Sequence, residues 1–253
     1  MTFCGDWLYL QQPRKDYIMK ISQDTLAILK NFSTINSNLL VKEGSYLTTI
    51  SPTKNILAEA NVSETFDVEF GIWDLSKFLA TVSLFKDPEF NFTEDHVEIS
   101  SEGSKAAIKY YYSEPELLVK VDKKLKMPTT PVTFTLTSKD YNELQKASSV
   151  LQAPDLSLES TEDNRMVMRV FDRKDSTSHS YSIDMGENKS GTSFSFLFKT
   201  ENLKMIPGTY EVGISEKKVS QFRNANGMTY WISLEADSVF EGSNSKVANV
   251  ATR

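Results

Sequence analysis

The sequence predicts an α+β fold built from two similar domains, each with two helices packed against an antiparallel sheet. Three observations support this prediction. A helical pattern occurs twice, an alternating strand pattern that leads into a short helical pattern also occurs twice, and a stretch rich in proline and lysine separates the two halves. Because four elements recur in the same order, we interpret the chain as a duplicated unit.

The first helical pattern recurs 115 residues further along the chain. The matched pairs are Ile21 with Leu136, Leu29 with Leu144 and Ile35 with Val150. Ser22 stands where the first helix needs a cap, and Thr137-Ser138-Lys139-Asp140 has the spacing of a capping box at the second. We therefore expect a helix at the start of each half.

The strand pattern gives the second repeat. Phe66-x-Val68-x-Phe70 alternates like a half-buried strand, and Phe194-x-Phe196-x-Phe198 does the same 128 residues later. The first strand leads into Leu75-x-x-Phe78, with Asp74 as its cap, and the other leads into Leu203-x-x-Ile206. We therefore expect a second helix in each half, and the longer offset indicates a loop insertion.

These patterns divide the chain into five parts. We expect a disordered extension at residues 1–18, a first domain at 19–114, an interdomain connector at 115–131, a second domain at 132–240 and a disordered tail at 241–253. Prolines and lysines make the connector extended and polar. Met19-Lys20-Ile21-Ser22 resembles a natural start better than Met1 does.

Bulk composition excludes several classes of protein. The formal net charge is −6 and the pI is about 5.2, which argues against a chain held on nucleic acid by its overall charge. Cys4 is the single cysteine, so no internal disulfide can form, and this fits a reducing cytoplasm. No apolar run is long enough for a membrane span, so we expect no membrane association.

The sequence offers no catalytic centre. His96 and His179 are the only histidines and fall on different repeats, so no metal site is indicated. Phosphate-binding, dinucleotide-binding and nucleophile-elbow motifs are absent. Acidic pairs such as Glu94-Asp95 fall in predicted turns, where solvated charge is the ordinary interpretation. We expect no enzyme activity, no catalytic residue, no cofactor and no metal.

Five motifs, in register with the duplication, resemble the sliding clamps of T-even-type bacteriophages. They are Leu29-Lys30-Asn31-Phe32-Ser33-Thr34-Ile35-Asn36-Ser37, Ala58-Glu59-Ala60-Asn61-Val62-Ser63, Asp74-Leu75-x-x-Phe78-Leu79-x-x-x-Ser83-Leu84, Lys204-Met205-x-Pro207-Gly208-x-Tyr210 and Leu234-Glu235-Ala236-Asp237-Ser238. The resemblance runs from about Met19 to Ser238. The leader, the tail and a shorter stretch between Tyr210 and Trp231 depart from it.

The resemblance implies a DNA-clamp fold and a homotrimeric ring with helices around the hole and sheets outside. It also implies a processivity factor that encircles duplex DNA without sequence preference and tethers a DNA polymerase by its C-terminal tail. A clamp-loader ATPase would load the ring in the cytoplasm of the infected bacterial host. In related phages the clamp also activates late transcription, which would add late sigma-like and co-activator proteins as partners.

Lysines on the polar helix stripes are the candidate DNA contacts. Exposed charges that face DNA across water would give a weak, sequence-independent attraction that does not stop sliding. The alternative is that these lysines are ordinary solvated helix faces. The predicted DNA-channel residues are Lys30, Lys77, Lys139, Lys146 and Lys204.

Two further surfaces follow from the resemblance. Polymerase tails should dock beside the connector, although Met205 and Ile206 could instead be core residues. Subunits should pair through edge strands at residues 107–112 and 178–183. The predicted groove residues are Leu118, Val119, Val121, Met205, Ile206 and Pro207. The predicted interface residues are Ile108, Tyr110, Tyr111, Tyr112, Ser180, Tyr181 and Ile183.

Two other functions compete with this interpretation. A duplicated, non-enzymatic virion or adaptor protein would share the repeat but would form no ring around DNA. A sequence-specific DNA reader would need Arg, Asn or Gln concentrated on a recognition element. The arginines of the second half are Arg165, Arg169, Arg173 and Arg223, and the first half has none after Arg14, which makes a reader improbable.

Overall fold

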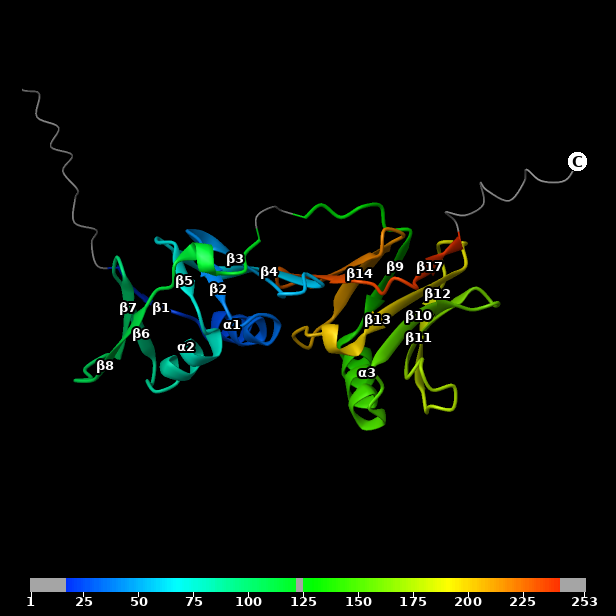
Figure 1. The fold of residues 1–253 in the computed structure, drawn as a ribbon, viewed down its shortest axis with the longest axis horizontal. Coiled ribbons are helices and arrows are strands. Elements are labelled where there is room, and N and C mark those ends of the chain that lie inside the picture. Colours follow the sequence, from blue (N-terminus) through cyan, green and yellow to red (C-terminus); the bar gives the residue numbers. More distant parts are fainter. Residues whose placement is uncertain (1–16, 122–124, 242–253) are drawn as a thin grey trace, which may run out of the picture.

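The computed structural model describes residues 17–121 and 125–241 (Figure 1). Strand β1 (Tyr17–Lys20) pairs antiparallel with β6 (Pro88–Phe92). Strand β1 therefore includes the last two residues of the predicted extension, Tyr17 and Ile18. The rest of that extension and the tail from residue 242 lie outside the described residues.

The first half contains two helices and an outer four-stranded antiparallel sheet of order β1-β6-β7-β8. Strands β7 (His96–Ser101) and β8 (Ala107–Tyr111) complete this sheet, and β2 (Leu39–Val41) pairs with β5 (Phe70–Ile72). Helices α1 (Gln23–Ile35) and α2 (Leu75–Val82) lie against one another. Phe78 of α2 meets Tyr110 of β8 edge to face with ring centroids 5.1 Å apart, which joins the helix layer to the outermost strand.

The second half has an outer five-stranded sheet of order β12-β11-β10-β13-β17. Its strands are β10 (Asp155–Ser160), β11 (Arg165–Phe171), β12 (Tyr181–Glu187), β13 (Phe194–Lys199) and β17 (Val239–Phe240). Helix α3 (Ser138–Leu151) packs on this sheet through buried Tyr141 and Leu144. The inward-facing residues of β13 alternate as predicted, with Phe194, Phe196 and Phe198 buried.

A six-stranded antiparallel sheet runs through both halves in the order β3-β4-β16-β15-β14-β9. Its strands are β3 (Gly44–Ile50), β4 (Ile56–Phe66), β9 (Val132–Leu136), β14 (Tyr210–Ser215), β15 (Val219–Arg223) and β16 (Met228–Ser233). The halves meet where β4 pairs with β16, with Leu57 opposite Trp231. The helices lie on one side of this sheet, and the connector, which begins with the 3-10 helix η1 (Pro115–Leu117), runs along the other (Figure 1).

All three predicted helix caps are confirmed. The side-chain oxygens of Ser22, Asp74 and Thr137 each accept a hydrogen bond from the backbone N–H three residues later, at 2.9–3.2 Å. The Glu64 carboxylate also accepts hydrogen bonds of 2.5 Å from Ser22 N and Thr25 Oγ1 at the start of α1. Burial would raise the pKa of Glu64, but these hydrogen bonds outweigh it and leave the pKa lowered.

The predicted fourth helix is wrong. Residues 200–202 form only the single 3-10 turn η2 (Thr200–Asn202), and residues 203–206 form no helix. Four residues separate Asn202 from Pro207, and proline disfavours a helical conformation in the residue before it. The described part of the second half therefore has one α-helix, where two were expected.

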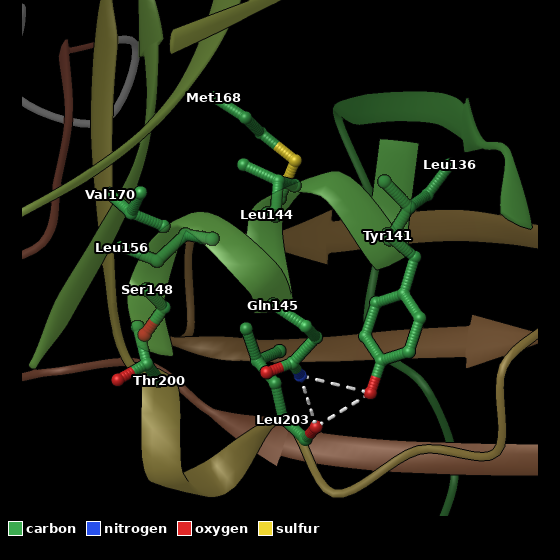
Figure 2. Close-up of a pocket in the computed structure, with 10 residues that line it drawn as sticks. All are labelled: Leu136, Tyr141, Leu144, Gln145, Ser148, Leu156, Met168, Val170, Thr200 and Leu203. Carbon is green, nitrogen blue, oxygen red and sulfur yellow. Dashed lines mark hydrogen bonds between the residues drawn. The ribbon is translucent and has the colours of Figure 1, made fainter. Parts of the chain in front are cut away.

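Helix α3 provides the contacts that hold this irregular segment in place. The Tyr141 hydroxyl donates to the Leu203 carbonyl at 2.7 Å, and Gln145 Nε2 donates to the same carbonyl at 2.8 Å and to the hydroxyl at 3.0 Å (Figure 2). Burial raises the pKa of Tyr141, so its hydroxyl stays protonated and able to donate. Polar side chains of α3 thus satisfy a carbonyl that a helix could not have satisfied internally, because Pro207, four residues later, has no N–H.

Candidate nucleic-acid interface and docking surfaces

The three α-helices of the described residues lie on one side of the six-stranded sheet (Figure 1), and each carries at least one exposed lysine. Lys30 on α1, Lys77 on α2 and Lys146 on α3 are exposed. Lys139 is also exposed on α3, but its Nζ lies 3.9 Å from Glu143 Oε1, so its charge is partly compensated. Four of the five predicted DNA-channel lysines therefore project from one helix layer, as a weak phosphate contact would require.

Lys204 differs from the other predicted DNA contacts. It lies in the segment after η2 rather than on a helix, so its predicted position on a helical stripe is wrong. Its Nζ donates to the Thr34 carbonyl in the last turn of α1 at 2.7 Å. The ammonium group is thus already engaged within the protein.

Strands β8 and β12 are outermost in their sheets, and they lie at opposite ends of the molecule (Figure 1). Tyr111 on β8 is 64% exposed, Ile108 is partly buried, and Tyr110 and Tyr112 pack partly buried on the core. On β12, Ile183 packs partly buried while Tyr181 is exposed and donates to Glu143 Oε2 at 2.9 Å. Ser180, just before β12, is exposed. Each end therefore offers an unpaired backbone edge flanked by aromatic side chains.

Hydrogen-bond alternation identifies the backbone groups that face outward. Tyr112 N donates to Asp95 O at 3.0 Å, so Tyr110 and Ile108 also bond to β7, and the N–H of Tyr111 points away from the sheet. Thr161 N donates to Arg165 O at 2.9 Å, so alternate residues of β11, beginning with Arg165, bond to β10. Val170 lies between two of them and therefore bonds to β12, where its partner is Tyr181. The backbone groups of the next residue, Ser182, point away from the sheet. Tyr111 and Ser182 therefore present outward-facing groups for strand pairing.

The structure does not bring the predicted groove residues together. Met205 is buried, and its carbonyl accepts from the Tyr141 hydroxyl at 3.0 Å, so it belongs to the core. Ile206 N donates to the Tyr230 hydroxyl at 3.1 Å on the same side. Figure 1 shows the connector on the opposite side of the six-stranded sheet. The prediction that Met205, Ile206 and Pro207 share a groove with the connector is therefore wrong.

The connector residues themselves take different positions. Leu118 is buried against Gly71, where an added Cβ would come within 2.8 Å of Leu118 Cδ1. Val119 is tied by its backbone N–H to Asn38 Oδ1 at 3.1 Å. Two hollows lie beneath the connector. Of the three predicted connector residues, Val121 lines the larger one. The first part of the connector is therefore anchored to the first half.

An apolar groove of about 300 Å³ lies between the connector and the six-stranded sheet. Trp231, Leu57 and Ile50 form its floor, and Leu125 of the connector, 48% exposed, covers one side. The indole Nε1 of Trp231 lies 3.4 Å from Glu59 Oε2, which orients the ring. The full lining is Ile50, Lys54, Asn55, Leu57, Lys120, Val121, Leu125, Val219, Trp231 and Ser233. Apolar walls with lysines at the rim suit an apolar peptide anchor beside acidic residues.

Sequence reasoning missed Trp231, the largest side chain of this groove. One signal was available. In Met228–Ser233, Tyr230 and Ile232 occupy one face of the strand, so Trp231 must occupy the other. A large aromatic residue on the face opposite the core indicates a covered or binding surface.

The two histidines of the chain lie in different halves and have different surroundings. His96 Nδ1 lies 2.6 Å from Asp95 Oδ1, and the hydrogen bond with His96 lowers the pKa of Asp95. His179 is exposed. Among residues 17–121 and 125–241, no three His, Cys, Asp or Glu side chains gather as a metal site would require. No helix in that part of the chain is long and apolar enough to cross a membrane.

Comparisons with known proteins cover both halves. A family model described as DNA polymerase processivity factor matches residues 21–120, and one described as gp45 sliding clamp, C terminal, matches residues 133–236. The sliding clamp of Enterobacteria phage T4 is 30% identical over 231 residues, which are 88% of this chain and all of that relative. The sliding clamp of Vibrio phage KVP40 is 28% identical over 222 residues, 86% of this chain and all of that relative.

Solved structures show the same architecture. The proliferating cellular nuclear antigen of Entamoeba histolytica superposes with a TM-score of 0.64 at 12% identity, over 87% of this chain and 99% of that one. The DNA polymerase III β chain of Streptococcus pneumoniae gives 0.63 at 13% identity, over 87% of this chain and 65% of that one. Such low identity shows the fold alone, and the fold is that of a DNA clamp. With the family models and the phage relatives, it follows that this chain belongs to the sliding-clamp family of DNA polymerase processivity factors.

Proposed function

We propose that three copies of this chain close head to tail into a ring around duplex DNA and tether a DNA polymerase, without catalysing a reaction. One observation supports this most directly. Two unpaired edge strands, β8 and β12, lie at opposite ends of one chain, and all three α-helices face the same side. Different edges that pair head to tail give a heterologous contact, which closes into a ring when the rotation between copies is right.

The lysine-bearing helix layer would then line the hole. Lys30, Lys77 and Lys146 would attract phosphates across water, with Lys139 contributing less because of Glu143. Exposed charges separated by solvent are screened over about 8–10 Å at physiological salt, so the attraction is real but weak. The overall charge of −6 is compatible with this arrangement, since a lysine-bearing helix layer can belong to a chain that is acidic overall. Topological closure, rather than affinity, would hold the DNA.

Native mass spectrometry and retention on DNA test the ring. We expect a trimer mass, and retention on closed circular DNA that is lost when the circle is cut, after loading by the clamp-loader ATPase of the same phage. A closed ring cannot enter circular DNA without being opened, which is why we propose that ATPase as a partner. A monomer that binds linear and circular DNA equally would contradict the proposal and would favour an adaptor or virion protein.

We further propose that the polymerase's C-terminal tail docks in the groove floored by Trp231. Its apolar floor and basic rim are complementary to an apolar anchor flanked by acidic residues. Late sigma-like and co-activator proteins, if they bind this clamp, would compete for the same groove.

The phage origin of the relatives supports the cytoplasm of the infected bacterial host as the place of action.

Leu125→Asp is expected to weaken binding of the polymerase tail peptide by about tenfold or more, because a carboxylate would enter an apolar wall. Titration of the labelled peptide followed by fluorescence anisotropy measures the effect. Leu117→Asp is the matched control, since Leu117 lies in η1, is 64% exposed and does not line the groove. Equal affinities for both variants would remove the tail from this groove.

A further inference from the structure

The two halves of the chain are joined at two different levels. In the sheet layer, the β4–β16 ladder joins them from Ile56 to Ala60. In the helix layer, Lys204 Nζ donates to Thr34 O at 2.7 Å, and Asn31 Nδ2 donates to Lys204 O at 2.9 Å. We call this second connection the Asn31–Lys204 contact. It joins α1 to the segment that follows η2.

The C-terminal end of α1 has no basic residue of its own to complement the helix dipole. The carbonyls of a last turn also lack partners within the helix. Lysine near a helix C-terminus satisfies such a carbonyl and complements the helix dipole. Here the lysine comes from the other half of the chain. The interaction therefore depends on the relative position of the two halves.

Asn31 is fixed from both sides by groups of the second half. While its Nδ2 donates to Lys204 O, its Oδ1 accepts from the Tyr230 hydroxyl at 2.7 Å. Tyr230 is fully buried, and its hydroxyl also accepts from Ile206 N at 3.1 Å. Both hydrogen-bonding ends of the amide are thus held by a rigid part of the second half.

A single β-ladder attaches two bodies along one line, and bodies attached along one line can still rotate about it. A contact at a distance from that line restricts this rotation. Asn31 and Thr34 belong to α1 and Lys204 to the segment after η2, so the Asn31–Lys204 contact lies outside the β4–β16 ladder. A ring of identical subunits closes only when the angle within each subunit is correct.

We infer that the Asn31–Lys204 contact sets the angle between the two domains. Lys204 is then a positioning residue for ring closure, not one of the lysines that attract DNA. The effect on ring closure rests on the proposed trimeric ring. The effect on the domain angle does not, since every atom of the contact belongs to one chain.

Distances between two spin labels measure the domain angle directly. The full chain carries Cys4→Ser, with Asp67→Cys in an exposed turn of the first half and Glu216→Cys in an exposed turn of the second. Labelled subunits are diluted with unlabelled ones, so that pulsed electron spin resonance reports distances within one subunit. Lys204→Met and Asn31→Ala are each compared with Lys204→Arg and with Lys77→Met.

Lys204→Met removes one charge-assisted hydrogen bond, and Asn31→Ala removes both hydrogen bonds of its amide. Each is expected to broaden the distance distribution and to raise the trimer dissociation constant by about tenfold. Lys204→Arg should retain the narrow distribution. Lys77→Met should also retain it, but should reduce the salt dependence of DNA retention, whereas Lys204→Met should not. Because Lys204 is exposed, its substitution leaves the core intact.

Two results would overturn the inference. One is an unchanged distance distribution in both Lys204→Met and Asn31→Ala. The other is a reduced salt dependence in Lys204→Met like that of Lys77→Met, which would make Lys204 a DNA contact. A wild-type chain that forms no trimer would instead refute the proposed function, while the distance measurement would still decide about the contact.

Discussion

Proline in place of Tyr111 is expected to leave the subunit folded and to abolish the trimer. The N–H of Tyr111 points away from β7, so its loss breaks no hydrogen bond inside the subunit. In a paired interface the same change removes a ladder hydrogen bond and leaves the facing carbonyl unpaired, at a cost of about 1–3 kcal/mol for each interface. This corresponds to an interface that is weaker by about tenfold to 100-fold. Native mass spectrometry over a dilution series measures it.

The opposite edge supplies a complementary variant. Ser182→Pro should also abolish the trimer, whereas Tyr181→Pro should destabilise the subunit itself, because Tyr181 bonds to β11. Tyr111→Pro keeps an intact β12, and Ser182→Pro keeps an intact β8. A mixture of the two should therefore give dimers joined by one normal interface. Trimers that survive in either variant alone would place the subunit interface elsewhere.

Removing three inner lysines is expected to shorten processive synthesis by about tenfold, since each exposed contact contributes roughly 0.2–1 kcal/mol and three are lost per subunit. The variant is Lys30→Ala, Lys77→Ala and Lys146→Ala together. Lys139 is left in place because Glu143 already compensates its charge. Product length in a primer-extension assay with one polymerase binding event measures the loss. Lower salt should restore part of it.

The matched control removes three lysines away from the helix layer. Lys42, Lys189 and Lys217 are exposed and lie in turns between strands. Both triple variants change the net charge equally, so a general charge effect would be the same in both. Trimer mass should be unaffected in each. A greater loss of processivity in the Lys42, Lys189 and Lys217 variant would mean that the helix layer faces outward.

Features encoded by neighbouring residues could be predicted from the sequence. Ser22, Asp74 and Thr137 cap their helices because a cap depends only on the next three residues. The duplication and the buried alternation of Phe194, Phe196 and Phe198 depend on local periodicity too. The polar stripes that carry Lys30 and Lys77 follow from the same helical period.

Features that depend on distant residues could not be predicted. The segment from Leu203 to Ile206 has apolar spacing like that of α2, but Pro207 and the hydrogen bonds from Tyr141 hold it without a helix. The groove beneath the connector is formed by strands from both halves, and no local pattern shows that Trp231 lies opposite Leu57. Hydrogen bonds from a distant side chain decided the first outcome, and long-range strand register decided the second.

The sheet that passes through both halves has a consequence for recombination between related clamps. An exchange of whole domains would be joined at the connector. The contacts that such a hybrid must match, however, lie where β4 meets β16 and where Asn31 meets Tyr230. If the two parent clamps differ at those pairs, the chimera would have an intact connector but mismatched contacts between its two halves. The whole chain must therefore be inherited as one unit, although its sequence shows two similar halves.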